Sequence, residues 1–326
     1  MRATATKTAN VSERGHSARK TALAYAMVYM FWGSTFLAVR YAVQTIPPLL
    51  MVGTRQILAG LALYPLARLH SKEKTTVRQW LDGALIGALL IAGGNASIAW
   101  AEARRTPSNV AAVLVATVPL WMAIFDWMRP KGPRPTVRVA LGLGIGLAGV
   151  GLLVSPTDPL LHTAGGAVNV LCAGVLFCGS LAWAGGSVFS RHMELPQSPL
   201  LGTAIITLMG GAVTCGVALA MGEGSQLDLH RVTVQSWISL GYLAVFGSIL
   251  GFSAYNYLLV AEPAARVATY AYVNPVVAVI LGWAVAGERL TARMALAAAI
   301  ILAAVVLVIT SPHPPEEGAG QPVVPD

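Results

Sequence analysis

Apolar stretches long enough to cross a lipid bilayer recur along almost the whole chain, and this limits its fold more than any other feature. About 20 apolar residues in a helix span the hydrocarbon core of a bilayer. We count ten such stretches, at residues 21–43, 49–69, 80–101, 107–128, 137–154, 165–188, 199–221, 234–258, 264–286 and 292–310. The runs are continuous and do not alternate, which argues against a transmembrane β-barrel. We therefore expect an all-α membrane protein with ten transmembrane helices.

The overall composition agrees with a chain that lies mostly in lipid. Charged residues make up 11% of it, whereas soluble domains carry about 25%. The net charge of +8 comes mainly from lysines and arginines in the segments between the apolar stretches, where basic residues orient membrane proteins. The charge therefore predicts a lipid bilayer as the surroundings and no nucleic-acid partner.

The two ends of the chain are polar. Residues 1–20 are basic, but the apolar run that follows is too long for a signal peptide and lacks a small-residue cleavage site. We expect a cytoplasmic tail at 1–20 and, because residues 311–326 are rich in proline, glycine and acid, a disordered tail there. With the N-terminus inside, most lysines and arginines fall on the inner side. This bias predicts that both termini lie in the cytoplasm, and we expect the membrane to be the inner membrane of a bacterium.

The second half of the chain repeats landmarks of the first in the same order. Trp32, Pro48, Trp80, Pro107 and Pro119 recur as Trp183, Pro199, Trp237, Pro263 and Pro275. We therefore expect two five-helix repeats, at residues 21–154 and 165–310. Because each repeat has an odd number of spans, the two must lie in the membrane with opposite orientations. Inverted repeats with a substrate site between them, near the middle of the bilayer, are a transporter architecture.

Several short motifs sit within this repeated pattern. They are WGSTF at 32–36, an arginine in the second stretch, Arg55, and GERLT at 287–291. Together with the ten stretches they resemble the EamA-type members of the drug/metabolite transporter superfamily, over about residues 21–310. The resemblance implies a carrier of small metabolites, often an exporter of amino acids or related compounds. It also implies a central cavity lined by helices from both repeats.

Arg55 is the charged residue deepest in an apolar stretch. An arginine there must face a partner or water, because an unpaired charge in hydrocarbon is costly. One interpretation is a substrate-binding fork for a carboxylate or phosphate, which a guanidinium binds with two parallel hydrogen bonds. The other is a structural arginine that bonds carbonyls at a helix end.

Other polar and aromatic residues inside the stretches are candidates for lining the cavity. They are Trp32, Asn95, Trp100, Trp183, Asn256, Tyr270 and Asn274, and a lining of amides and aromatic rings suits a zwitterionic or partly apolar solute. The alternatives are that the asparagines bond neighbouring helices and that the tryptophans only pack or lie at the membrane interface. Pro119 and Pro275 are expected to kink their helices and act as hinges.

The sequence gives no sign of a catalytic or metal site. No histidine lies within an apolar stretch, the three cysteines form no CxxC pair, and the motifs HExxH and GxSxG are missing. We therefore expect no catalytic residues, no metal and no cofactor. The acids Asp82, Glu102, Asp126 and Glu288 all fall near the ends of stretches, which favours facilitated or exchange transport, because proton-coupled carriers commonly use a buried acid or histidine.

These observations together predict a secondary transporter that is not an enzyme. We expect it to move small metabolites, amino acids or related solutes, across the membrane by alternating access, with export as the direction. A polytopic membrane enzyme and a channel-like facilitator remain the alternatives.

The stretch 137–154 carries Gly142 and Gly146 at GxxxG spacing. We assign this spacing to helix packing within a monomer, while a dimer stays open.

Overall fold

The computed structural model describes residues 18–104, 115–129, 132, 134–153, 170–286 and 292–311, and every regular element in them is helical. The first half contains η1 (Val28–Trp32), α2 (Gly33–Ala42), α3 (Pro48–His70), α4 (Val77–Gly87), η2 (Ala88–Asn95), α5 (Ala96–Ala103), α7 (Val118–Met128) and α8 (Val137–Leu153). The second half contains α9 (Val170–Phe189), α10 (Pro199–Ala220), α11 (Glu223–Gln226), η4 (Leu229–Arg231), α12 (Val234–Tyr242), η5 (Leu243–Leu250), α13 (Gly251–Ala261), α14 (Ala264–Val267), α15 (Tyr270–Ala286) and α16 (Ala292–Ile309).

Six of the described helices are long and apolar enough to cross a membrane. They are Ala18–Ala42, Pro48–His70, Val77–Ala103, Leu171–Phe189, Pro199–Ala220 and Val234–Ala261. Val118–Met128, Val137–Leu152 and Ala295–Ile309 are shorter apolar helices. The multi-span helical fold is therefore present, whereas the number of ten spans stays a prediction. Most of both predicted tails, together with Glu288 and Pro107, lies outside the described residues.

Matching residues begin matching helices in the two halves. Pro48 and Pro199 each stand in the first turn of a long helix, α3 and α10, where the missing N–H of proline costs nothing. Thr76 caps α4 by accepting a hydrogen bond from the Gln79 N–H, and Thr233 caps α12 in the same way. The sequence repeat is thus also a repeat of helix starts.

The third span of each half is interrupted by a π-helical segment. In the first half η2 lies between α4 and α5, and in the second half η5 lies between α12 and α13. A π segment holds one extra residue per turn and often occurs at functional sites. Asn95 ends η2, so this change of register sets the direction of its side chain.

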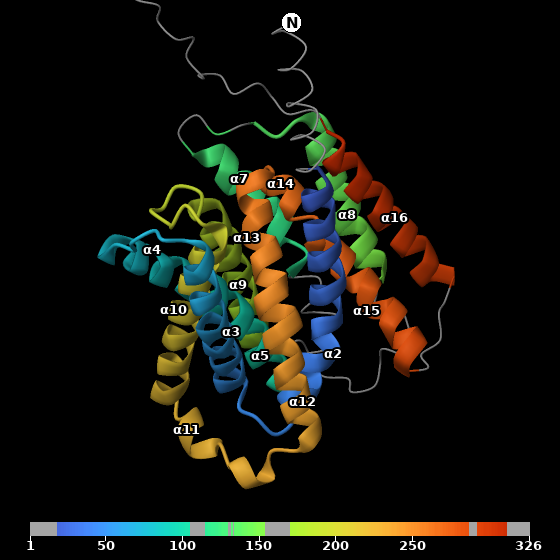
Figure 1. The fold of residues 1–326 in the computed structure, drawn as a ribbon. Helices are drawn as coiled ribbons and strands as arrows, with labels where there is room; N and C mark the ends of the chain where they lie inside the picture. The colour runs from blue at the N-terminus through green and yellow to red at the C-terminus, as the bar shows by residue number, and fades with distance from the viewer. Residues whose placement is uncertain are drawn as a thin grey trace, which may run out of the picture.

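Helices of one half pack mainly against helices of the other (Figure 1). The main pairs are α3 with α10, α8 with α16, α9 with η2, α10 with α4, α7 with α9, α10 with η2, α12 with α2, α3 with η5, and α15 with α2. Exchanging the two halves turns several of these pairs into one another: α3 with α10 and α8 with α16 map onto themselves, α7 with α9 becomes α15 with α2, and α10 with η2 becomes α3 with η5. The two halves therefore form one bundle with an internal symmetry.

The glycines of α8 are used within the chain. A Cβ at Gly142 would overlap Val308 of α16, and a Cβ at Gly146 would overlap the ring of Tyr272. The Tyr272 hydroxyl also donates a hydrogen bond to the Leu143 carbonyl, at 3.1 Å. Close approach of α8 to α15 and α16 thus accounts for the GxxxG spacing.

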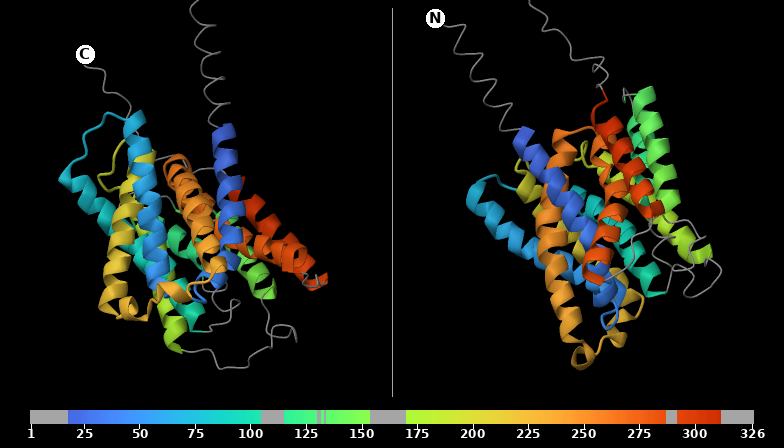
Figure 2. Two further views of the ribbon diagram at one scale, coloured as in Figure 1. Left: turned by 60° about the horizontal axis from the view of Figure 1, so that its bottom comes forward. Right: turned by 90° about the vertical axis from the view of Figure 1, so that its right-hand side faces the viewer.

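The two ends of the described chain lie at the same end of the bundle, which we call the termini end (Figures 1 and 2). Arg266, at the start of the α14–α15 segment, donates a hydrogen bond to the carbonyl of Ser311, just after α16, at 2.6 Å. The segment that joins α10 to α12 lies at the opposite end, which we call the far end (Figure 1).

Candidate functional site

A cavity lies between the two halves of the bundle. The room inside it for the centres of water-sized molecules is about 90 Å³. Helices η1, α2, α3, η2, α5 and α7 of the first half line it together with α9, η5, α13 and α15 of the second. Each half therefore contributes one side of the cavity.

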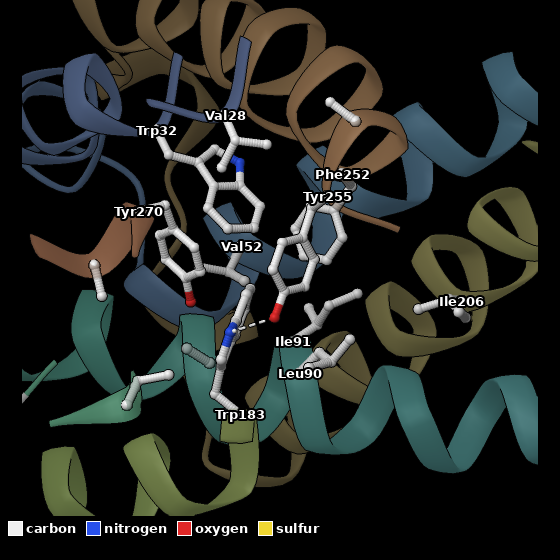
Figure 3. Close-up of a cluster of buried hydrophobic side chains, with 14 of the residues drawn as sticks. Val28, Trp32, Val52, Leu90, Ile91, Trp183, Ile206, Phe252, Tyr255 and Tyr270 are labelled. Carbon is white, nitrogen blue, oxygen red and sulfur yellow. Dashed lines mark hydrogen bonds between the residues drawn. The ribbon is translucent and has the colours of Figure 1, made fainter. Parts of the chain in front are cut away.

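Tryptophans from equivalent positions in the two halves meet at the deep end of this cavity. The rings of Trp32 and Trp183 lie edge to face, and Tyr255 and Tyr270 pack beside them (Figure 3). The ring centroid of Trp32 is 4.8 Å from that of Tyr255 and 4.9 Å from that of Tyr270. Such tilted and edge-to-face contacts are favourable aromatic geometries. We call Trp32, Trp183, Phe252, Tyr255 and Tyr270 the aromatic cluster.

Hydrogen bonds fix the polar ends of these rings. The indole N–H of Trp32 donates to the Gly247 carbonyl at 3.0 Å, and that of Trp183 donates to the Tyr255 hydroxyl at 3.1 Å (Figure 3). Gly94 makes room for this arrangement, because a Cβ there would overlap the ring of Trp183. Both indole N–H groups of the cluster therefore already donate hydrogen bonds within the protein.

Polar groups without protein partners face the same cavity. Arg55 is 5% exposed, and its Nε has no hydrogen-bond partner in the described part of the chain. The same holds for Oδ1 of Asn274 and Oε2 of Glu102. Buried polar groups normally have partners, so these three atoms mark places where a bound molecule or water would be held.

The cavity extends from the aromatic cluster toward the far end of the bundle. From Trp32, the last residue of η1, its lining continues along α2 through Thr35 to Val39, and at the end of α5 it includes Glu102. Since α2 runs away from the termini end (Figure 1), these residues lie progressively nearer the far end.

At the termini end, side-chain contacts close the bundle above the aromatic cluster. The hydroxyls of Tyr29 and Thr269 are hydrogen-bonded at 2.7 Å, which joins η1 to the segment before α15. Arg191 donates a hydrogen bond to the Glu262 carbonyl, and burial lowers the pKa of this guanidinium. Arg129 links Asp126 to His192. We call these contacts the termini-end closure.

Six of the eight residues predicted to bind substrate line the cavity, namely Trp32, Arg55, Asn95, Trp183, Tyr270 and Asn274. Asn256 lies elsewhere, because it is buried between helices and donates a hydrogen bond to Thr203 at 3.0 Å. Trp100 lies on a neighbouring, mostly apolar groove lined mainly by η2, α5, α9 and α10, which shares Ser97 and Gly179 with the cavity. Their role in binding stays a prediction.

The two predicted hinge prolines have different surroundings. Pro275 lies inside α15, where proline breaks the hydrogen-bond ladder of a helix. Pro119 lies in the first turn of α7, where proline is tolerated without a kink. Although the two prolines are equivalent in the sequence repeat, only Pro275 lies where proline disturbs a helix.

Glu102 is a charged cavity residue that sequence reasoning missed. Its position near the end of an apolar stretch suggested a group at the membrane surface. The cavity, however, reaches that end of α5 and includes the side chain. The signal that could have found it is the presence of an acid on the same helix as Asn95, two helical turns farther along.

Comparison with known proteins gives matches over nearly the whole chain. The profile of the EamA-like transporter family matches residues 20–155 and again residues 170–310. The uncharacterized inner membrane transporter YedA of Escherichia coli K12 is 38% identical over 86% of this chain and 88% of its own length. The uncharacterized transporter YvbV of Bacillus subtilis is 25% identical over 90% of each chain. A crystal structure with 18% sequence identity has the same fold, with a TM-score of 0.69 over 88% of this chain and 96% of that one.

Proposed function

This chain belongs to the EamA-like transporter family, and from this premise we propose that it carries amino acids or related small solutes out of the cell by alternating access. It is a multi-pass membrane protein whose relatives are named as transporters. The solute class, the outward direction and the mechanism are the proposed steps.

The observation that carries the proposal is a cavity whose lining includes Arg55, a cation that forms no ion pair among the described residues. A guanidinium binds a carboxylate with two parallel hydrogen bonds, and a solute carboxylate would supply the partner that Arg55 lacks. Asn274 and the aromatic cluster lie on the same lining. An amide and aromatic rings next to a cation suit a small solute with a carboxylate and an apolar part.

The symmetry of helix pairing supports alternating access. If each half, at 21–154 and 165–310, contains five spans, the two halves have opposite orientations in the membrane. Exchanging their conformations then turns a cavity that opens at one end into one that opens at the other. With both termini in the cytoplasm, the cavity described above extends toward the outside, and the termini-end closure separates it from the cytoplasm.

Transport by purified protein in liposomes tests this proposal. The probe is a labelled mixture of the proteinogenic amino acids, and uptake is measured with and without the same amino acids unlabelled inside. We expect saturable uptake that is faster when the inner compartment is loaded. Uptake that rises linearly with amino-acid concentration and does not depend on the amino acids inside the liposomes would favour a channel. If none of the amino acids is taken up, the proposed solute class is wrong.

Two substitutions of Arg55 test whether its guanidinium binds the solute carboxylate. Arg55→Lys keeps the charge but loses the fork, and Arg55→Gln loses both. We expect uptake to fall in the order wild type, lysine, glutamine. The alternative of a structural Arg55 predicts loss of folded protein in Arg55→Gln, which size-exclusion chromatography in detergent detects.

A further inference from the structure

Glu102 differs from the other carboxylates in the described part of the chain. Its Oε2 is the one carboxylate oxygen there that is shielded from solvent without a hydrogen-bond partner. Glu223 accepts hydrogen bonds from the backbone N–H groups of Leu49 and Leu50. Asp82 pairs with Arg78 and Asp126 pairs with Arg129. The environment of Glu102 therefore requires an explanation that these buried acids do not.

The charged groups around Glu102 are arginines, and none forms an ion pair with it among the described residues. Arg40 of α2 acts on it electrostatically, and Arg55 of α3 lines the same cavity. On its own helix, Arg104 lies over the ring of Trp100, 3.6 Å from the centroid. Of the other helices that pack on α5, η2 contains no ionisable side chain, and α9 contributes only cysteines in its described part.

A carboxylate without a partner inside a membrane protein is costly in its charged form. Two events can remove this cost: uptake of a proton, or arrival of a cation in the cavity. A proton is available when the cavity is empty. A solute with an ammonium group can bring the cation when the cavity is filled, while its carboxylate faces Arg55 on the same lining.

We infer that Glu102 is an exchange site, at which a proton and the ammonium group of the solute bind in turn and exclude one another. This inference rests on the function proposed above and adds the coupling ion to it. One carboxylate cannot hold both partners, so solute leaves Glu102 at the outer side as a proton replaces it, and the proton leaves at the inner side as solute binds. Each cycle then moves one solute outward and one proton inward.

The sequence favoured facilitated or exchange transport because no acid lay deep in an apolar stretch. The cavity changes this expectation, since it reaches Glu102 near the end of α5. The expectation of exchange transport is kept, and the two exchanged species are now the solute and a proton.

The protonation step can be tested without any solute. Dicyclohexylcarbodiimide, an apolar reagent, modifies protonated carboxyl groups in apolar surroundings. The folded full-length protein is treated in liposomes at several pH values, and adducts are mapped by mass spectrometry. We expect an adduct at Glu102 whose yield decreases as the pH rises. Glu223, Asp82 and Asp126, which are buried but paired, serve as controls in the same molecule and are expected to stay unmodified.

The exchange step is tested by the pH dependence of uptake in liposomes, with the labelled amino-acid mixture as the probe. Competition by protons should raise the apparent KM of the wild type as the pH falls, by up to about tenfold per pH unit by mass action. Glu102→Gln cannot release a proton, so its KM should not change with pH. Glu194→Gln makes the same chemical change at an exposed position and should behave as the wild type.

The possible outcomes separate this inference from the proposed function. Amino-acid uptake by the wild type with a KM independent of pH would overturn the exchange site and leave the function standing. Retention of the pH dependence in Glu102→Gln would do the same. If the wild type takes up no amino acid, the solute class is wrong, and the carbodiimide result alone then decides whether Glu102 binds protons: an adduct that is absent at low pH overturns the inference.

Discussion

The indole rings of Trp32 and Trp183 meet edge to face, with centroids 5.4 Å apart and an angle of 77° between their planes. The two residues hold equivalent positions in the two halves of the chain, and both are 8% exposed. Their contact joins the halves at the deep end of the cavity. Movement of one half relative to the other must therefore change the packing of these two rings.

The first prediction concerns this contact. Trp183→Ala should reduce the free energy of unfolding by about 3–5 kcal/mol, because it removes a large buried ring and leaves a void. Trp183→Phe keeps most of the ring packing and loses the hydrogen bond to Tyr255, so its cost should be about 1 kcal/mol. Reversible unfolding in mixed micelles measures both values. Equal effects of the two substitutions would show that the ring packing contributes little.

Arg55 gives the second prediction. Arg55→Ala should raise the KM for carboxylate solutes by about 10- to 100-fold, the equivalent of a lost charge-assisted hydrogen bond. Because the guanidinium has no ion pair among the described residues, the variant should still fold. Uptake in liposomes measures KM, and circular dichroism checks folding. Normal transport by the folded variant would reject the carboxylate-binding role.

Much of the fold and part of the cavity could be predicted from the sequence, because both depend on patterns of neighbouring residues. Long apolar runs specify spans, and Pro48 and Pro199 mark equivalent helix starts. Which side of a helix faces the cavity depends on packing. Asn95 lines the cavity and Asn256 bonds Thr203, although both are amides inside apolar stretches.

The π-helical segments and the depth of the cavity could not be predicted. Both η2 and η5 arise within ordinary apolar sequence, and the extra residue per turn changes which side chains face inward. In the sequence, the short distance between Glu102 and the end of its apolar stretch indicates a group at the membrane surface. A cavity that reaches this end alters its surroundings without altering the sequence pattern.

Pro275 supports the third prediction. It lies inside α15, next to Asn274 of the cavity lining, so a more regular helix should resist the movement that opens and closes the cavity. Pro275→Ala should lower the turnover rate more than it changes KM. Pro119→Ala is the matched control, because Pro119 lies in the first turn of α7 and should have little effect. An unchanged turnover in Pro275→Ala would show that the proline is incidental.

The fourth prediction concerns a cap that joins the two halves. Glu223, between α10 and α12, accepts hydrogen bonds from the N–H groups of Leu49 and Leu50 at the start of α3. Loss of a helix N-cap costs about 1–2 kcal/mol, so Glu223→Ala should lower the free energy of unfolding by about this amount. Glu223→Gln keeps an acceptor oxygen and should lose less. Unfolding in mixed micelles gives both numbers, and a fully stable alanine variant would contradict the capping role.

The last prediction tests the termini-end closure through Tyr29. Its hydroxyl bonds Thr269 at 2.7 Å, and a cavity that opens at the termini end must separate these two groups. Removing one such hydrogen bond in Tyr29→Phe should favour the alternative state by about 1 kcal/mol, which is roughly a fivefold change in its population. The measurement is the rate at which a membrane-impermeant maleimide, added at the termini side, labels Ala99→Cys in a chain without its native cysteines. Ala99 lines the cavity and is 1% exposed, so labelling requires opening, and an unchanged rate in Tyr29→Phe would show that this bond does not hold the closure.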